Sequence, residues 1–473
     1  MGTKVPKDLT NGIQARLSPT SPHRLHSSLA ALTGLRFIAA FDVVLYHFAH
    51  IPLPAWANPA KNIIGSGFVG VSLFFILSGF IMAYTYLAPD GGLRGTSRNF
   101  YASRFARIFP AYLLGFVLAA PTDIFLSLRA NPVAIASLKL AVNGILVLAF
   151  VQAWTPYTAW AWNFPAWSVS VEVFFYALFP WLGPRLSRIP LSRCLVVAAG
   201  LWIVSLVAPT ALFLLKGPTG PPQIGDYLQM AVEFTPLLRV PEFAIGILVG
   251  RVFVAGGFDR LRNGLLSLIV ALIILMVMAF SPHLSHPFLA GGLLTPLFVL
   301  LIVTLAGGNG PLASFLSMPF MILLGEASYG IYILQIPVSY VLRCPPPHTS
   351  GRVLLTYCGA LVFVALLSFR FIESPLRLRI RRWLGGPEPS IIRSNASANS
   401  LVWAQGPVDP AVATIGSTDQ AKGPARKTTR RSVVVGISAA AGASAVYGAV
   451  RFMRGARSQP GRRCLYLLRN LSG

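Results

Sequence analysis

The sequence predicts an all-α protein, a polytopic transmembrane helical bundle of about ten spans. Of its 473 residues, 55% are hydrophobic and only 11% are charged, whereas soluble domains carry about 25% charged residues. Apolar runs of about 20 residues recur along the chain, which is the length of helix that crosses a bilayer. These observations exclude a cytosolic enzyme, a secreted disulfide scaffold and a disordered protein.

The first 30 residues are polar and basic, with Lys4, Lys7, Arg16 and Arg24 against Asp8. They contain no apolar stretch, so we expect no cleavable signal peptide, and the first span would act as its own insertion signal. We interpret 1–30 as a cytoplasmic basic segment and 31–383 as the transmembrane domain.

Eleven apolar segments are candidate spans. They lie at 31–50, 67–87, 109–128, 134–151, 167–183, 194–215, 231–250, 264–281, 288–306, 319–342 and 353–372.

Basic loops limit how many of these candidates cross, because cytoplasmic loops are enriched in Lys and Arg. Arginines gather at 88–108, 185–193, 251–262 and 377–382. With the basic N-terminus inside, ten crossings place all four groups inside, whereas eleven place the last three outside. One candidate between 109 and 151 is therefore expected not to cross. The first contains Pro110, Pro121 and Asp123 and the second contains Lys139, so both stay open.

Residues 384–473 are predicted to form a basic, largely disordered tail. From Ser374 onward the chain has 16 basic and 3 acidic residues, which supplies +13 of the total net charge of +25. The charge-free segment 432–450 predicts either a weak extra span or an interfacial segment. Basic tails of this kind contact anionic membrane lipid. Nucleic-acid binding is the rival interpretation, but no nucleic-acid motif accompanies the charge, so we expect no nucleic-acid partner.

The first span contains Arg36 and His47, although ionisable groups are costly in hydrocarbon. Eleven residues separate them, so they share one helix face with a rise of about 16 Å between them. They are interpreted either as a functional pair or as an arginine that reaches the headgroups and a packed histidine.

Metal binding is not expected. His47 and His50 have a spacing that could hold a metal, but no third ligand has a suitable spacing. The four cysteines lack CxxC spacing and are interpreted as packing residues.

Arg104 and Arg107 lie among aromatic residues in FYASRFARIFP. Their spacing places them on one helical face, which we expect at the exposed cytoplasmic surface. Guanidinium groups bind phosphate bidentately, so the face suits a phosphate-bearing cofactor. The alternative is an interfacial helix whose arginines meet lipid phosphates.

Glu172 is a carboxylate inside the predicted fifth span, with Ser168 one turn away. It is interpreted either as a functional acid–base group or as a structural glutamate paired to an arginine of a neighbouring helix. Further polar positions are Arg239 and Glu242, Ser328 with Tyr329 and Gln335, and Glu373.

Together these residues resemble acyltransferase family three, the integral-membrane O-acyltransferases of sugars, polysaccharides and some antibiotics. The motifs run in the family's order from Arg36–His47 through Gly70–Phe80, Arg104–Pro110, Trp167–Tyr176 and Ser328–Tyr332 to Glu373–Pro375. The resemblance covers about Ala31 to Arg382.

The resemblance implies transfer of an acetyl or short acyl group from acetyl-CoA or another acyl-CoA to a carbohydrate hydroxyl, in a bacterial plasma membrane. It implies His47, Arg36 and Glu172 as catalytic residues and Arg104 and Arg107 as cofactor-binding residues. The sequence departs from the family at Gln335, where a histidine is common.

Direct transfer is the leading hypothesis, because an imidazole accepts and releases a proton near neutral pH. A transporter or flippase of a glycan or lipid-linked substrate is the alternative. It would require charged residues along a midplane pathway and broken helices in matching halves, whereas the charges here gather in the first third of the chain and at cytoplasmic ends.

Overall fold

The computed structural model describes residues 22–50, 54–261, 263–342 and 350–385. The predictions for most of the N-terminal segment and for the tail, including 432–450, lie outside these residues. Within them the chain forms helices joined by turns and no β-strand, and Leu87 and Leu93 pair in an isolated bridge. The predicted all-α class is confirmed.

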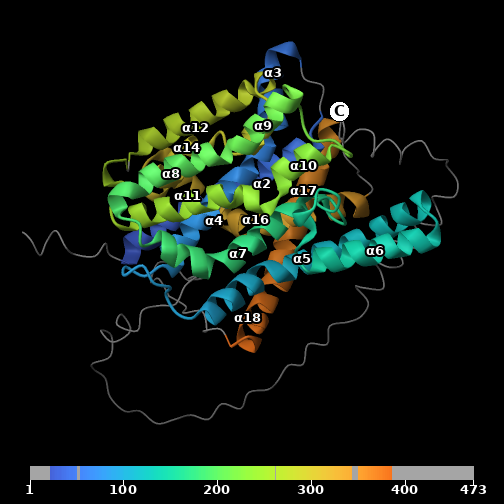
Figure 1. Ribbon diagram of the computed structural model, residues 1–473, viewed down its shortest axis with the longest axis horizontal. Coiled ribbons are helices and arrows are strands. Elements are labelled where there is room, and N and C mark those ends of the chain that lie inside the picture. Colours follow the sequence, from blue (N-terminus) through green and yellow to red (C-terminus); the bar gives the residue numbers. More distant parts are fainter. Residues whose placement is uncertain (1–21, 51–53, 262, 343–349, 386–473) are drawn as a thin grey trace, which may run out of the picture. The chain divides into compact units, whose positions relative to one another are not determined.

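The α-helices are α2 (Pro22–Phe48), α3 (Asn58–Gly65), α4 (Gly70–Tyr86), α5 (Ser97–Ala130), α6 (Val133–Leu148), α7 (Trp167–Leu186), α8 (Leu191–Ser205), α9 (Val207–Lys216), α10 (Tyr227–Phe234), α11 (Pro236–Val254), α12 (Gly264–Ala279), α13 (His286–Ala290), α14 (Thr295–Ala306), α15 (Pro311–Leu316), α16 (Pro319–Val341), α17 (Gly351–Ser368) and α18 (Ser374–Trp383). Figure 1 shows how they are arranged.

Among the described residues, eight helical stretches are long and apolar enough to cross a membrane. Two shorter apolar helices, α6 and α12, lie outside this set. The 19-residue α11 is also outside it. The protein is a polytopic helical bundle, as predicted, and the count of ten crossings remains a prediction.

Helices α2, α4, α11 and α16 form the middle of the bundle in Figure 1, and glycines allow their backbones to touch. A Cβ atom on Gly79 of α4 would overlap the backbone of α11 at Phe243, and one on Gly246 would overlap α4 at Ile76. A Cβ on Gly325 of α16 would overlap the backbone of α2 at Thr33. Small residues at such contacts are typical of membrane helices, because close approach increases dispersion contact.

The region with two rival spans forms a pair of neighbouring helices, α5 and α6 (Figure 1). The Thr96 side chain caps α5 by accepting a hydrogen bond from the Asn99 amide at 3.2 Å. The helix continues for 34 residues through Pro110 and Pro121, so neither proline ends it. α6 has only 16 residues, which makes it the better candidate for the segment that does not cross.

Candidate active site

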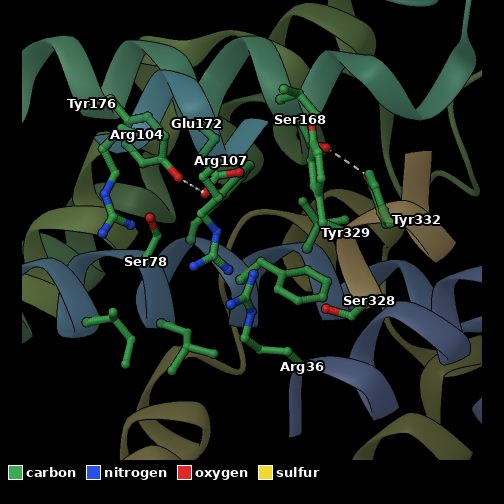
Figure 2. A pocket seen from close by; sticks show the side chains of 16 residues that line it. Arg36, Ser78, Arg104, Arg107, Ser168, Glu172, Tyr176, Ser328, Tyr329 and Tyr332 are labelled. Carbon is green, nitrogen blue, oxygen red and sulfur yellow. Dashed lines mark hydrogen bonds between the residues drawn. The ribbon is translucent and has the colours of Figure 1, made fainter. Parts of the chain in front are cut away.

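A cavity of about 80 Å³ lies between α2, α4, α5, α7 and α16. Its polar lining consists of Arg36, Ser78, Arg104, Arg107, Ser168, Glu172, Tyr176, Ser328, Tyr329 and Tyr332, shown in Figure 2. Four of the five site residues predicted from sequence are therefore brought together from three helices. The cavity is smaller than the roughly 300–1,000 Å³ of typical ligand pockets, so it accommodates only part of a ligand.

Three arginines converge on this cavity (Figure 2). Arg107 and Arg104 lie close enough to Arg36 to interact with it electrostatically. Like charges repel each other, so a site that gathers three guanidinium groups against the single carboxylate of Glu172 favours an anionic ligand.

The prediction that Arg104 lies on an exposed basic face is wrong. Its side chain is buried, with only 5% of its surface exposed. Its Nη2 donates a hydrogen bond to the Tyr86 hydroxyl at 2.8 Å, and its guanidinium lies 4.8 Å from the Tyr86 ring centre and 5.8 Å from that of Tyr176. Cation–π contacts of this kind hold the charge in a desolvated site.

Further charged side chains lie near the three arginines that line the cavity. Arg377 of α18 interacts electrostatically with Arg104 and Arg107, and the carboxylates of Glu326 and Glu373 partly balance it. Glu373, the polar position that closes the last predicted span, accepts a hydrogen bond from Ser368 Oγ at 3.0 Å. These groups lie outside the cavity lining, so a ligand in the cavity meets the three arginines first.

Glu172 faces the cavity and accepts a short hydrogen bond of 2.5 Å from the Tyr176 hydroxyl, one helical turn away. It also interacts electrostatically with Arg36. The carboxylate therefore faces the ligand space beside a charged partner on α2.

From the opposite side of the cavity a path of contacts leads along α16; it passes through Tyr332, whose hydroxyl and backbone carbonyl each form one hydrogen bond. Ser168 Oγ donates to the Pro165 carbonyl at 3.0 Å, which uses its only hydrogen, so the Tyr332 hydroxyl donates to Ser168 Oγ at 2.8 Å. The Tyr332 carbonyl accepts from Gln335 Nε2 at 2.7 Å. The path thus leaves the cavity and follows α16.

His47 lies at the end of this path, outside the cavity lining. Its Nδ1 is 2.8 Å from Gln335 Oε1, while its ring packs edge-on against Phe164 with centroids 5.2 Å apart. Arg36 and His47 both face α16, one toward the cavity and the other toward Gln335, so the predicted shared face is present. Eleven residues of helix correspond to a rise of about 16 Å, so the two residues lie at different levels along α2.

Gln335 fixes the proton position on His47. If the amide were turned around, its oxygen would face the Tyr332 carbonyl oxygen, and two acceptors would oppose each other. The amide nitrogen therefore donates to Tyr332 and Oε1 faces His47. His47 must then donate from Nδ1, which leaves the lone pair of Nε2 as its basic site.

In the sequence Gln335 stands out only as a departure from the family pattern, and its contact with His47 was not predicted. The local signal was its place three residues after Tyr332 on the same helix face, but pairing with a histidine 288 residues earlier has no local signature. Tyr86, the partner of Arg104, was missed for the same reason.

Two other predicted polar positions do not line the cavity. Arg239 and Glu242 form a buried ion pair within α11 at 3.4 Å, with the Arg239 guanidinium 5.4 Å from the centre of the Phe75 ring. Groups of three or more potential metal-ligating side chains are not found among the described residues.

Comparisons with known proteins identify the family of this chain. A family model described as an acyltransferase domain matches residues 29–372, so this chain belongs to acyltransferase family three. The chain is 31% identical over 235 residues to acyltransferase MdmB of Streptomyces mycarofaciens, a match that covers 48% of this chain and 58% of that protein.

Two further relatives are O-acetyltransferases. The peptidoglycan O-acetyltransferase OatA of Listeria monocytogenes is 27% identical over 73% of this chain and 55% of its own length. The O-acetyltransferase OatA of Staphylococcus aureus is 23% identical over 74% of this chain and 57% of its own. The chain thus spans a little over half the length of these relatives. No solved structure matches it.

Proposed function

We propose that this protein transfers an acetyl or short acyl group from acyl-CoA to a hydroxyl group of a cell-surface carbohydrate. Family membership supports the acyltransferase chemistry. Two relatives, a peptidoglycan O-acetyltransferase and an O-acetyltransferase, support an acetyl group and a glycan acceptor. The apolar helices support an integral membrane location, which we propose to be the bacterial plasma membrane, in contact with membrane lipid.

The observation that carries the proposal is the placement of an anion site and a histidine at two points along one helix. Three arginines line the cavity at Arg36, and His47 lies about 16 Å further along α2. An acyl-CoA has the same polarity, with phosphates at one end and a thioester at the end of an extended pantetheine arm. Arg104 and Arg107 would bind the phosphates, and the arm would extend along α16 toward His47.

The chemistry follows from the hydrogen bond to Gln335. His47 Nε2 takes the proton from the acceptor hydroxyl as its oxygen attacks the thioester carbonyl. The new C–O bond forms, the C–S bond breaks, and the proton on Nε2 passes to the leaving thiolate of CoA. Gln335 Oε1 stabilises the transient imidazolium through Nδ1–H. Arg36 holds the donor's phosphates, and Glu172 positions Arg36.

An assay in proteoliposomes tests the proposal. Purified protein is supplied with radiolabelled acetyl-CoA and peptidoglycan fragments or other cell-wall glycans, and label in the glycan is measured. We expect transfer that depends on both donor and glycan. The proposal would be overturned if the wild-type protein neither labelled the glycan nor consumed the thioester.

A further inference from the structure

A second polar site lies at the end of α2 that carries His47. The segment between α9 and α10 encloses an open pocket of about 500 Å³. Its lining consists of Lys216, Thr219, Gly220, Pro221, Gln223, Ile224, Gly225, Asp226 and Gln229. The Lys216–Asp226 pair, 2.5 Å apart, balances the charge of this lining, so the pocket suits a neutral polar ligand rather than an anion.

Behind the pocket is a buried hydrogen-bonded chain that the proposed transfer does not use. Gln229 Nε2 donates to Glu233 Oε1 at 2.8 Å, and His286 Nδ1 lies 3.0 Å from the same oxygen. His286 Nε2 is buried without a hydrogen-bond partner. Thr219 Oγ1, in the pocket lining, is likewise buried and unpartnered. Unsatisfied buried polar atoms are costly unless a ligand or water meets them.

A series of aromatic ring contacts links this group of hydrogen-bonded residues to His47. Phe68 stacks on His286 with centroids 3.9 Å apart. Tyr46 lies 5.4 Å from Phe68 and 5.0 Å from the His47 ring. The pocket and His47 therefore lie at the same end of the bundle, whereas the arginine cavity lies toward the other end of α2.

A pair of exposed aromatic rings begins at a residue that follows a lining residue of the pocket in sequence. Tyr227 follows the pocket residue Asp226 directly, and its ring lies 4.2 Å from that of Tyr157. These rings are exposed to 42% and 73%, although large aromatic side chains favour burial. Trp160, three residues after Tyr157, packs on Phe164 at 4.8 Å, and Phe164 contacts His47. Aromatic residues thus lead from the surface to the base.

We propose that this pocket and the Tyr157–Tyr227 pair form the binding site for a neutral segment of the carbohydrate acceptor. Sugar rings present apolar C–H faces that pack on aromatic rings and hydroxyl groups that bond to amide and carboxylate side chains. Gln223 and Asp226 of the lining supply such groups, and Asp226 directly precedes Tyr227. The inference rests on the proposed function for its acceptor class, and it places the acceptor on the His47 side, opposite the donor's phosphates.

The test measures glycan binding directly, so it does not depend on catalysis. Protein in nanodiscs is titrated with chitotetraose, cellotetraose and mannotetraose, and binding is followed by saturation-transfer NMR. We expect at least one of these glycans to bind the wild type. Tyr227→Ala and Tyr157→Ala should each weaken its binding about tenfold, the change that corresponds to ~1.4 kcal/mol. Tyr227→Phe should bind like the wild type, because the ring is kept.

Trp56→Ala is the matched control, since Trp56 is another large exposed aromatic residue, 84% exposed, that belongs neither to the pocket lining nor to the Tyr157–Tyr227 pair. It should bind glycan like the wild type, and a thermal melt of each variant checks folding. Unchanged binding in both tyrosine variants, or no binding of any of the three glycans, overturns the site. Loss of transfer with intact glycan binding would instead count against the proposed function alone.

Discussion

The arginine cavity and the pocket between α9 and α10 differ in charge and in openness. The cavity holds three arginines and one glutamate in about 80 Å³. The pocket holds one lysine and one aspartate in about 500 Å³, and the exposed Tyr227 directly follows its lining residue Asp226. Under the two proposals, this difference corresponds to two classes of ligand: an anionic group bound by guanidinium groups, and a neutral sugar segment bound by aromatic rings and polar side chains.

The largest expected effect concerns the side of the membrane on which each site opens. We expect a cysteine at Lys61 or Gln223 to react with an impermeant maleimide added outside intact cells, and one at Arg98 to react only after permeabilisation. The wild-type chain gives the background of its native cysteines. Equal external labelling at Gln223 and Arg98 would show that the two sites do not open on opposite sides of the membrane.

Removal of the base should have the next largest effect. His47→Ala should lower kcat for acetyl transfer by about 10²–10⁴-fold, because general-base catalysis contributes that much, with insertion into the membrane unchanged. His50→Ala is the control, since His50 is exposed and lies outside both sites. A larger loss in His50→Ala would mean that the base has been assigned to the wrong histidine.

Arg107→Ala should affect the donor alone. Each hydrogen bond to a charged group contributes about 1.5–3 kcal/mol, so we expect the donor KM to rise roughly 10- to 150-fold while kcat changes little. Arg107→Lys should recover only part of the affinity, because an ammonium keeps the charge but loses the planar fork. A fall in kcat at unchanged donor KM would contradict a phosphate-binding role and favour a structural one.

The smallest effect is expected at Gln335. Gln335→Met keeps the side-chain length but removes the acceptor for His47 Nδ1, and we expect kcat to fall about tenfold with the donor KM unchanged. Gln335→Glu restores an acceptor for Nδ1 but places its second oxygen against the Tyr332 carbonyl, so we expect it to recover only part of kcat. Steady-state kinetics against acetyl-CoA distinguish the cases. Equal kcat for the Met and Glu variants would show that the hydrogen bond does not orient the base.

The fold was predictable from sequence because each span is a local apolar pattern. Arg36 and Glu172 were recognisable as candidates because charges in apolar helices are rare and need a partner, and Arg104 and Arg107 because their spacing places both on one helical face. The contacts that organise the site were not, since Arg104 meets Tyr86 and His47 meets Gln335 only after the helices pack. Burial of Arg104 likewise depends on α4 and α7, which the local sequence of α5 does not specify.

The backbone contact between Thr33 and Gly325 has a consequence for donor choice under the proposed function. It holds α2 against α16, and these two helices together carry Arg36 with Ser328 at one level and His47 with Gln335 at another. The spacing between the levels is fixed by continuous helix, so the pair acts as a ruler for the donor's arm. A thioester with a shortened arm could not reach His47 while its phosphates are bound by the arginines. It would therefore either bind weakly or bind without reacting.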